Sequence, residues 1–269
     1  MYQMGFIGTG NMGSAMAQAA AKVLPPDELL LANRTRAKAE RLAERIGGVV
    51  GDDEQTARES RYILLGVKPQ MMERVLHSIA PVLRERRDRF LLVTMAAGLT
   101  MERICQLADG EYPVIRIMPN TPCAIGAGTV LCCKNEAVTE EEYAFFKAAI
   151  RKSGTLVDLP EHLIDAGSAI SGCGPAYVYT FIESMADAGV ACGLTRQDAL
   201  SLAAATVNGA ARMVQEGAEH PAQLRDRVCS PGGSTIAGVL SLENDGFRGA
   251  VANCVRAAYE RTKELGNLK

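Results

Sequence analysis

Three glycines near the N-terminus have the spacing that a dinucleotide phosphate requires. Gly8, Gly10 and Gly13 follow a short apolar run and precede a stretch of small apolar residues able to form a helix. In such a strand–turn–helix unit the first glycine permits the tight turn, the second admits a pyrophosphate and the third lets the helix pack closely. The helix start adds free N–H groups and a positive dipole end. The motif alone is weak evidence, but its place directly after an apolar run predicts a dinucleotide site.

The residues after the second predicted strand favour a phosphorylated dinucleotide. An acidic side chain there would hold the adenosine ribose of NAD. Asn33 and Arg34 occupy the position instead. A guanidinium pairs with a 2′-phosphate through charge-assisted bonds of about 1.5–3 kcal/mol each. We therefore expect NADP(H), while NAD(H) stays open as a second cofactor; the alternative is that Arg34 only solvates a helix start.

A second glycine-rich loop predicts an anion site near the other end of the chain. Residues 228–235 read VCSPGGST and precede a predicted helix at 236–242. The N–H groups of a helix start, together with two hydroxyls, suit a carboxylate. A flexible linker is the alternative, but this loop lies between predicted helices of one domain, which favours the anion site.

The pattern of apolar runs predicts how these loops are positioned. Strands are expected at residues 4–7, 29–32, 62–67, 90–94, 114–118, 129–133 and 155–157, with a further short strand within residues 47–51. Helices between them give an α/β fold with a mainly parallel, doubly wound sheet of the Rossmann type. Ligands bind beyond the carboxyl ends of such strands. The turns at residues 8–13, 33–34, 67–69, 96–97 and 120–122 fall there, which predicts a cofactor cleft.

From about residue 161 the sequence changes in character. Strand-like runs stop, and helices are expected at 163–170, 176–192, 195–215, 236–242 and 246–265. We therefore divide the chain into a Rossmann-type domain at residues 1–160 and an all-α dimerisation domain at residues 161–269. A helical domain of roughly 100 residues with so much small apolar surface would complete its core on a second subunit. We expect a homodimer, and a core within one chain is the alternative.

Composition excludes several classes of partner. The net charge of −2 gives no electrostatic footprint for nucleic acid or an anionic membrane surface. We expect no signal peptide, and no stretch approaches the ~20 apolar residues of a membrane-spanning helix. The eight cysteines form no C-x-x-C pair, and His77, His162 and His220 are far apart. We expect reduced thiols, a cytoplasmic location and no metal site.

Five motifs together resemble the pyrroline-5-carboxylate reductase family. They are GFIGTGNMG at 5–13, VKPQ at 67–70, MPNTP at 118–122, SGCGPAYV at 171–178 and SPGGST at 230–235. The resemblance runs from residue 5 to about residue 266. It implies an NAD(P)H-dependent oxidoreductase that reduces 1-pyrroline-5-carboxylate to L-proline, the last step of proline biosynthesis. It also implies dimers with an active site between two subunits, which often assemble further into decamers.

Transferred by position, the resemblance implies two sets of site residues. The cofactor residues are Gly8, Thr9, Gly10, Asn11, Met12, Gly13, Asn33, Arg34, Asp53, Val67, Lys68, Pro69, Met95, Ala96 and Ala97. The substrate residues are Ser230, Gly233, Ser234 and Thr235, with the backbone N–H groups of the last two on the carboxylate. Thr235 is the expected catalytic residue, its hydroxyl near the ring nitrogen.

Two positions depart from the family pattern. Asp53 stands where many members have Asn near the adenosine ribose, and a carboxylate there could oppose a 2′-phosphate. Cys173 replaces the more usual Ser, which we expect to alter only packing because the two side chains are similar in size.

An imine substrate needs little acid–base chemistry, because a protonated imine is already a good hydride acceptor. The site must hold two rings about 3–3.5 Å apart and fix the carboxylate. We expect Thr235 to orient the imine nitrogen, with Lys68 the weaker candidate for an acid. One alternative is a related NADP-dependent reductase of a small imino or keto acid. Such enzymes commonly carry a Lys at the start of the long helix, and residues 171–175 have none. Another is a catalytically silent NADP-binding protein.

Overall fold

Residues 1–267, described by a computed structural model, form two compact units. The first unit contains residues 1–173 and the described residues from Ala258 onward, and the second contains residues 174–257. Within the described residues, no helix is both long and apolar enough to cross a bilayer.

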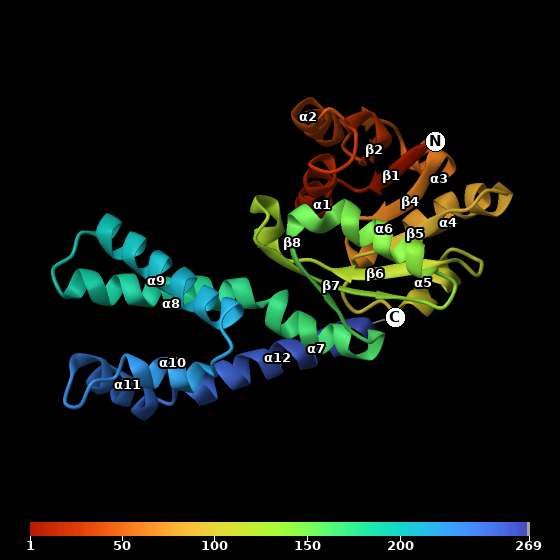
Figure 1. The fold of residues 1–269 in the computed structure, drawn as a ribbon. Coiled ribbons are helices and arrows are strands. Elements are labelled where there is room, and N and C mark those ends of the chain that lie inside the picture. The colour runs from red at the N-terminus through yellow and green to blue at the C-terminus, as the bar shows by residue number, and fades with distance from the viewer. Residues whose placement is uncertain (268–269) are drawn as a thin grey trace. The chain divides into compact units, whose positions relative to one another are not determined.

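An eight-stranded sheet forms the centre of the first unit (Figure 1). The strand order is β3-β2-β1-β4-β5-β6-β7-β8. The strands are β1 (Tyr2–Ile7), β2 (Leu29–Ala32), β3 (Val49–Val50), β4 (Ser60–Leu65), β5 (Leu91–Thr94), β6 (Val114–Met118), β7 (Gly128–Lys134) and β8 (Gly154–Asp158). All neighbours are parallel except β6 and β7. The predicted mainly parallel, doubly wound fold is therefore confirmed.

The antiparallel pair follows from the connection between its strands. Only the short 3-10 turn η2 (Thr121–Ile125) separates β6 from β7. A parallel return needs a crossover of a dozen or more residues, usually a helix, and this link is too short for one. The two strands therefore lie side by side in opposite directions.

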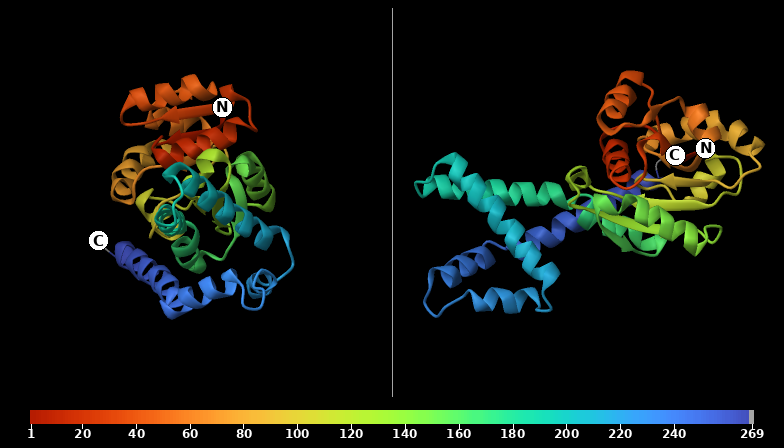
Figure 2. Two further views of the ribbon diagram at one scale, coloured as in Figure 1. Left: turned by 90° about the vertical axis from the view of Figure 1, so that its left-hand side faces the viewer. Right: turned by 45° about the horizontal axis from the view of Figure 1, so that its top comes forward.

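Helices cover both faces of the sheet (Figures 1 and 2). One apolar cluster contains residues of α1 (Asn11–Ala21), α2 (Arg36–Ile46) and α6 (Glu140–Ile150). The other contains residues of α3 (Asp53–Glu59), α4 (Pro69–Glu85), α5 (Met101–Leu107) and α7 (Glu161–Ser171).

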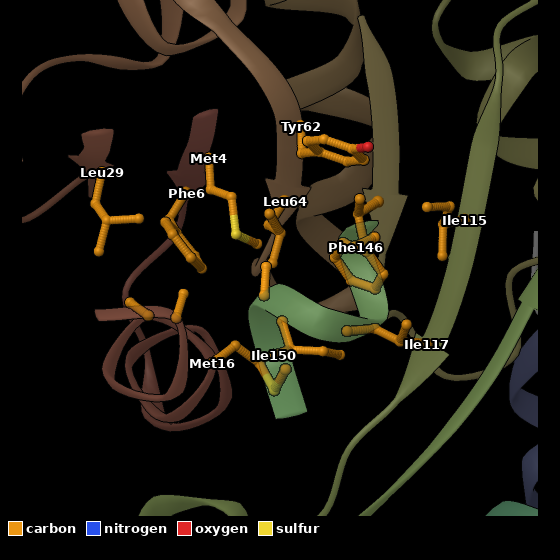
Figure 3. Packing of buried hydrophobic residues seen from close by; sticks show 14 of the residues in the cluster. Met4, Phe6, Met16, Leu29, Tyr62, Leu64, Ile115, Ile117, Phe146 and Ile150 are labelled. Carbon is orange, nitrogen blue, oxygen red and sulfur yellow. The ribbon is translucent and has the colours of Figure 1, made fainter. Parts of the chain in front are cut away.

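Successive strand residues supply opposite clusters, because side chains alternate across a strand. In β4, Tyr62 and Leu64 belong to the first cluster, and Ile63 and Leu65 to the second. Figure 3 shows the first cluster, in which Met16 of α1 lies below the sheet residue Phe6.

The second unit consists of helices alone. They are α8 (Gly174–Ala191), α9 (Arg196–Glu216), α10 (Pro221–Arg227), α11 (Ser234–Asn244) and the first part of α12 (Phe247–Asn267). Helices α8 and α9 lie side by side (Figures 1 and 2). Helix α10 was not expected from the sequence. It begins after His220, whose backbone N–H donates to Oε1 of Gln223 at 3.0 Å, a contact typical of a capped helix start.

Candidate functional site

Four loops of the predicted cofactor site lie at one edge of the sheet. They follow β1, β2, β4 and β5, which run parallel, so their carboxyl ends share that edge. Two backbone hydrogen bonds of 2.8 Å hold the ends of β1, β2 and β4 together. The Gly8 N–H donates to the carbonyl of Ala32, the last residue of β2, and the Gly66 N–H donates to the carbonyl of Ile7, the last residue of β1. The first unit therefore brings together residues 8–13, 33–34, 67–69 and 95–97.

Three glycines pack against one another beneath the first loop. Gly8 has φ +98°, a conformation that favours glycine. A Cβ on Gly13 would lie 2.1 Å from the Gly8 carbonyl oxygen, and one on Gly66 would lie 2.3 Å from the same atom. Gly66 was not predicted from the sequence, although a glycine at the end of a strand next to the glycine turn is a recognisable signal. A side chain at Gly13 or Gly66 would displace the loop.

Gly10 has the opposite surroundings. A Cβ built there meets no other part of the described chain within 4 Å. Gly10 also precedes α1 without offering a side-chain cap, so the helix opens on bare N–H groups. The hydroxyl of Thr9 is buried beside it, and within residues 1–267 it has no hydrogen-bond partner. An open Cβ position, bare N–H groups and an unpaired hydroxyl fit the phosphates of a dinucleotide.

These groups open into a cleft of about 520 Å³. Its lining residues are Thr9, Gly10, Asn11, Met12, Ser14, Gln18, Lys38, Arg41, Leu42, Arg45, Thr121 and Ala124. All belong to the first unit. The α2 residues of this set were not predicted from the sequence as site residues.

Asn33 and Arg34 have different surroundings at the end of β2. Oδ1 of Asn33 accepts the Thr9 N–H at 3.1 Å, and Nδ2 donates to the Thr35 carbonyl at 3.0 Å. Asn33 therefore fixes the glycine loop against the next loop. The Arg34 side chain is exposed, and no hydrogen bond or ion pair ties it to another described residue. Its guanidinium is available to an anion.

Asp53 follows β3 at the same edge, as the first residue of α3. Burial raises the pKa of this half-buried carboxyl, the neighbouring Asp52 raises it further, and Arg74 acts in the opposite direction. The Asp53 carboxyl therefore lies at the edge where an adenosine ribose would bind, as the sequence predicted.

The remaining cofactor candidates follow β4 and β5. Lys68 is exposed and precedes α4, which begins at Pro69, a residue suited to a first helical turn. Ala96 is buried, and its N–H donates to Oγ1 of Thr94 at 3.3 Å. Small side chains in this loop leave room at the sheet edge.

The predicted substrate residues come together at the start of α11, in the second unit. Gly232 has φ +67°, and the Gly233 N–H donates to the Ser230 carbonyl at 3.0 Å. A Cβ on Gly233 would lie 2.4 Å from Oγ of Ser230, so these two residues are close neighbours in the loop. Ser234 and Thr235 are exposed, and Gly233 gives the helix no side-chain cap. The arrangement can bind a carboxylate through N–H groups and hydroxyls.

The second unit exposes most of its large apolar side chains. Within residues 174–257, the buried apolar residues are Ala186, Ala199 and Ala203. Exposed ones are Val178, Tyr179, Phe181, Met185, Val190, Leu194, Leu200, Leu202, Met213, Val214, Val228, Leu240, Leu242, Phe247 and Val251. So much exposed apolar surface marks an interaction site.

Among residues 1–267, no three His, Cys, Asp or Glu side chains are grouped as metal ligands. All eight cysteines are free thiols. Burial raises the pKa of Cys132 to about 12 and that of Cys133 to about 11, so both are inert fillers of the core.

Comparison with known protein families gives two matches. Residues 161–265 match the family described as pyrroline-5-carboxylate reductase dimerisation. Residues 3–98 match the family described as NADP oxidoreductase, coenzyme F420-dependent.

Individual relatives match over nearly the whole chain. A pyrroline-5-carboxylate reductase from Synechocystis sp. is 42% identical over 267 residues, which cover 98% of each chain. The solved pyrroline carboxylate reductase of Plasmodium falciparum, with NADP bound, has a TM-score of 0.88 and 33% identity, covering 99% of this chain and 98% of that one. The pyrroline-5-carboxylate reductase of Coxiella burnetii has a TM-score of 0.90 and 31% identity, covering 99% of both.

Proposed function

The chain belongs to the pyrroline-5-carboxylate reductase family, and we propose that it reduces 1-pyrroline-5-carboxylate to L-proline with NADPH. The observation that carries the proposal is a pair of helix starts led by glycine and free of side-chain caps. Helix α1 opens after Gly10 with the features of a phosphate site, and α11 opens after Gly233 with those of a carboxylate site. A reductase of this substrate needs both.

We propose NADP(H) as the preferred cofactor, with NAD(H) as a second one. Its nicotinamide ring supplies the hydride when bound. The exposed Arg34 guanidinium supports NADP, as does the bound NADP of the Plasmodium falciparum relative. The Asp53 carboxylate acts in the opposite direction, because it would repel a 2′-phosphate, and it keeps NAD(H) as the second cofactor. The cofactor residues are those of the four loops at the sheet edge together with Asp53.

Ser230, Gly233, Ser234 and Thr235 are the proposed substrate residues. The N–H groups of Ser234 and Thr235 bind the carboxylate, which fixes the ring in the plane that hydride transfer requires. The hydroxyl of Thr235 hydrogen-bonds the imine nitrogen and orients it. Because an imine develops no oxyanion, the residues do not need to form an oxyanion hole, and positioning carries most of the catalysis.

We propose that residues 161–269 form the dimerisation and substrate domain, after a cofactor domain at residues 1–160. The match of residues 161–265 to the dimerisation family supports this division. The exposed apolar side chains of the second unit support a homodimer, because a partner subunit would remove them from water. Each active site then combines the cofactor domain of one subunit with the helical domain of the other, and the dimers build a higher oligomer such as a decamer.

We propose a cytoplasmic location because the cysteines, all of them within the described residues, are free thiols and form no disulfide bonds. Eight free cysteines, four of them buried, suit a reducing compartment.

The reaction is tested by following NADPH oxidation at 340 nm (the nicotinamide absorbance) with 1-pyrroline-5-carboxylate and with keto acids of similar size. We expect rapid oxidation with the imine and none above background with the keto acids. Turnover of a keto acid alone would overturn the proposal. Saturable NADPH binding without turnover of either substrate would instead indicate a cofactor-binding protein.

A further inference from the structure

The cleft beside the glycine loop continues away from it as a trough along helix α1. Its lining includes Ser14 and Gln18 of α1, which are one helical turn apart. Residues of α2 line it as well, and Thr121 and Ala124 of η2 complete the lining. The end near Thr9 adjoins the bare helix start described above. We call this surface the α1–α2 trough.

The lining of the α1–α2 trough is positively charged without compensation. Lys38, Arg41 and Arg45 are three and four residues apart, so they share one face of α2. The lining contains no aspartate or glutamate. Within residues 1–267 these three side chains make no ion pair, whereas Arg36 of the same helix pairs with Glu40 at 2.9 Å. On α2, the charge of Arg36 is therefore neutralised by Glu40, while the charges of Lys38, Arg41 and Arg45 are not paired within the described chain.

One polar group at the near end of the trough, the hydroxyl of Thr9, also lacks a partner among residues 1–267. Thr9 is only 4% exposed and lines the cleft, yet its hydroxyl has no hydrogen-bond partner among residues 1–267. The nearby Oγ of Ser14 is satisfied by the Thr9 carbonyl at 2.9 Å. A buried hydroxyl left unpaired costs free energy unless a ligand or water completes it. Together with the three cations, it points to an anionic ligand with several oxygens.

We propose that the α1–α2 trough binds a phosphate-bearing ligand, with Lys38, Arg41 and Arg45 on its phosphate oxygens. The volume of about 520 Å³ exceeds what a single phosphate fills. Because the trough shares residues Thr9 to Met12 with the proposed dinucleotide site, its ligand is either part of the cofactor or a separate phosphate compound that competes with it. The first of these two possibilities rests on the proposed function, because it assumes that the cofactor binds at the glycine loop. Binding of a phosphate compound to the trough can be measured without any enzymatic turnover.

Calorimetric titration of the full-length protein with inorganic tripolyphosphate tests the site. The test variant is the double substitution Arg41→Gln/Arg45→Gln, and Arg84→Gln is the matched control. Arg84 is a helical arginine of α4 that pairs with Asp109 and is absent from the trough lining. We expect saturable binding to wild type and to the control, weakened at least about tenfold in the double variant. Circular dichroism should show unchanged melting for both variants.

NADPH binding to wild type, to the double variant and to the Arg84→Gln control shows whether the phosphates belong to the cofactor or to another compound. A parallel loss of NADPH affinity in the double variant assigns the site to the cofactor. Unchanged NADPH affinity, with tripolyphosphate still raising the apparent Kd of NADPH in wild type, assigns it to a separate competing compound. The proposal is overturned if tripolyphosphate does not bind wild type, or if it binds the folded double variant equally well. A protein that binds tripolyphosphate but does not reduce 1-pyrroline-5-carboxylate would contradict the proposed function alone.

Discussion

At the scale of single residues, the glycines of the cofactor edge separate into two kinds. Gly66 is required by packing, because a Cβ there would lie 2.3 Å from the Gly8 carbonyl oxygen. Gly10 is not, because a Cβ there meets no other part of the described chain within 4 Å. Packing within the chain therefore leaves the position beside Gly10 open, as the proposed phosphate site requires.

We predict opposite behaviour for Gly10→Ala and Gly66→Ala. Gly10→Ala should melt within about 2 °C of wild type but bind NADPH at least tenfold more weakly, since its methyl group fills the phosphate position. Gly66→Ala should lose about 1–3 kcal/mol of stability through the clash with backbone. Thermal melting and NADPH fluorescence titration check both. Unchanged NADPH affinity in Gly10→Ala would contradict the assignment of the loop.

Thr235 is predicted to act as a positioning hydrogen-bond donor or acceptor and not as a strong acid. Thr235→Val should lower kcat/KM about 10- to 100-fold, the value of one or two hydrogen bonds. Thr235→Ser, which keeps the hydroxyl, should retain most activity. Steady-state kinetics of both variants make the comparison, and a fully active Thr235→Val enzyme would remove Thr235 from the mechanism.

Sequence spacing predicted residues whose role is local, and it missed those whose role depends on tertiary contacts. Gly8, Gly10 and Gly13 could be proposed from the sequence because their spacing along one loop forms a recognisable motif. Gly66 was missed because its neighbour is a carbonyl in a different loop. The cations of α2 were missed because only the structure shows which face of that helix borders α1.

At the scale of elements, the apolar runs located the strands well. The predicted strands at 29–32 and 114–118 match β2 and β6 residue for residue. The run at 62–67 was displaced: β4 ends at Leu65, because Gly66 already belongs to the glycine contact under the loop. The reversal of β7 was not foreseen, since an apolar run carries no information about strand direction.

The ion-pair partners of the buried Arg116 could not be predicted from the apolar pattern of its strand. Arg116 lies in the middle of β6 and is 1% exposed. Asp165 accepts a hydrogen bond from its guanidinium at 2.6 Å, and Glu161 lies 3.4 Å away. Both acids come from α7, one turn apart, so a buried charge fixes α7 to the sheet. An arginine inside an apolar run implied such a partner, but not which helix would supply it.

Helix α6 supplies a test of stability against pH. Glu142 accepts from Nε and Nη2 of Arg89 at 2.7 Å each, and from the Thr139 N–H at 3.0 Å. The hydrogen bond from Arg89 is the main cause that lowers the pKa of Glu142 from 4.5 to about 2. A lowered carboxyl pKa adds stability above the unfolded-state value and loses it as the pH falls through the folded-state value.

Glu142→Gln should therefore cost about 2 kcal/mol of unfolding free energy near pH 7. The difference from wild type should shrink between about pH 4.5 and pH 2, where Glu142 is progressively protonated. Urea unfolding across this range measures it. The neighbouring exposed Glu141→Gln is the control and should show little difference at any pH, whereas a pH-independent cost for Glu142→Gln would contradict the role of its charge.

At the scale of the whole molecule, the exposed apolar side chains of the helical unit indicate self-association. The apolar side chains that it buries within residues 174–257 are three alanines, while leucines, valines and aromatics remain exposed. The sequence predicted an interaction surface here from helices rich in small residues, whereas the exposed apolar side chains include many large ones. It could not supply the oligomer size, because that depends on contacts between subunits that no pattern within one chain encodes.

Met213→Glu should weaken the dimer, because it places a charge on this surface at a side chain that is 60% exposed. Sedimentation velocity should show a larger monomer fraction, and specific activity should fall on dilution if the active site needs two subunits. Arg87→Glu, at an exposed position in the first unit, serves as the control and should sediment as wild type does. An unchanged distribution for Met213→Glu would place the interface elsewhere.

The central claim is that the cofactor held by the first glycine loop passes a hydride to an imine held at the second. It is tested most directly with NADPH deuterated at the transferred position of C4 and 1-pyrroline-5-carboxylate as substrate. Mass spectrometry should then find proline one mass unit heavier, with the deuterium on the carbon of the former C=N bond. Unlabelled proline, or oxidation of the cofactor without any proline, would contradict the claim.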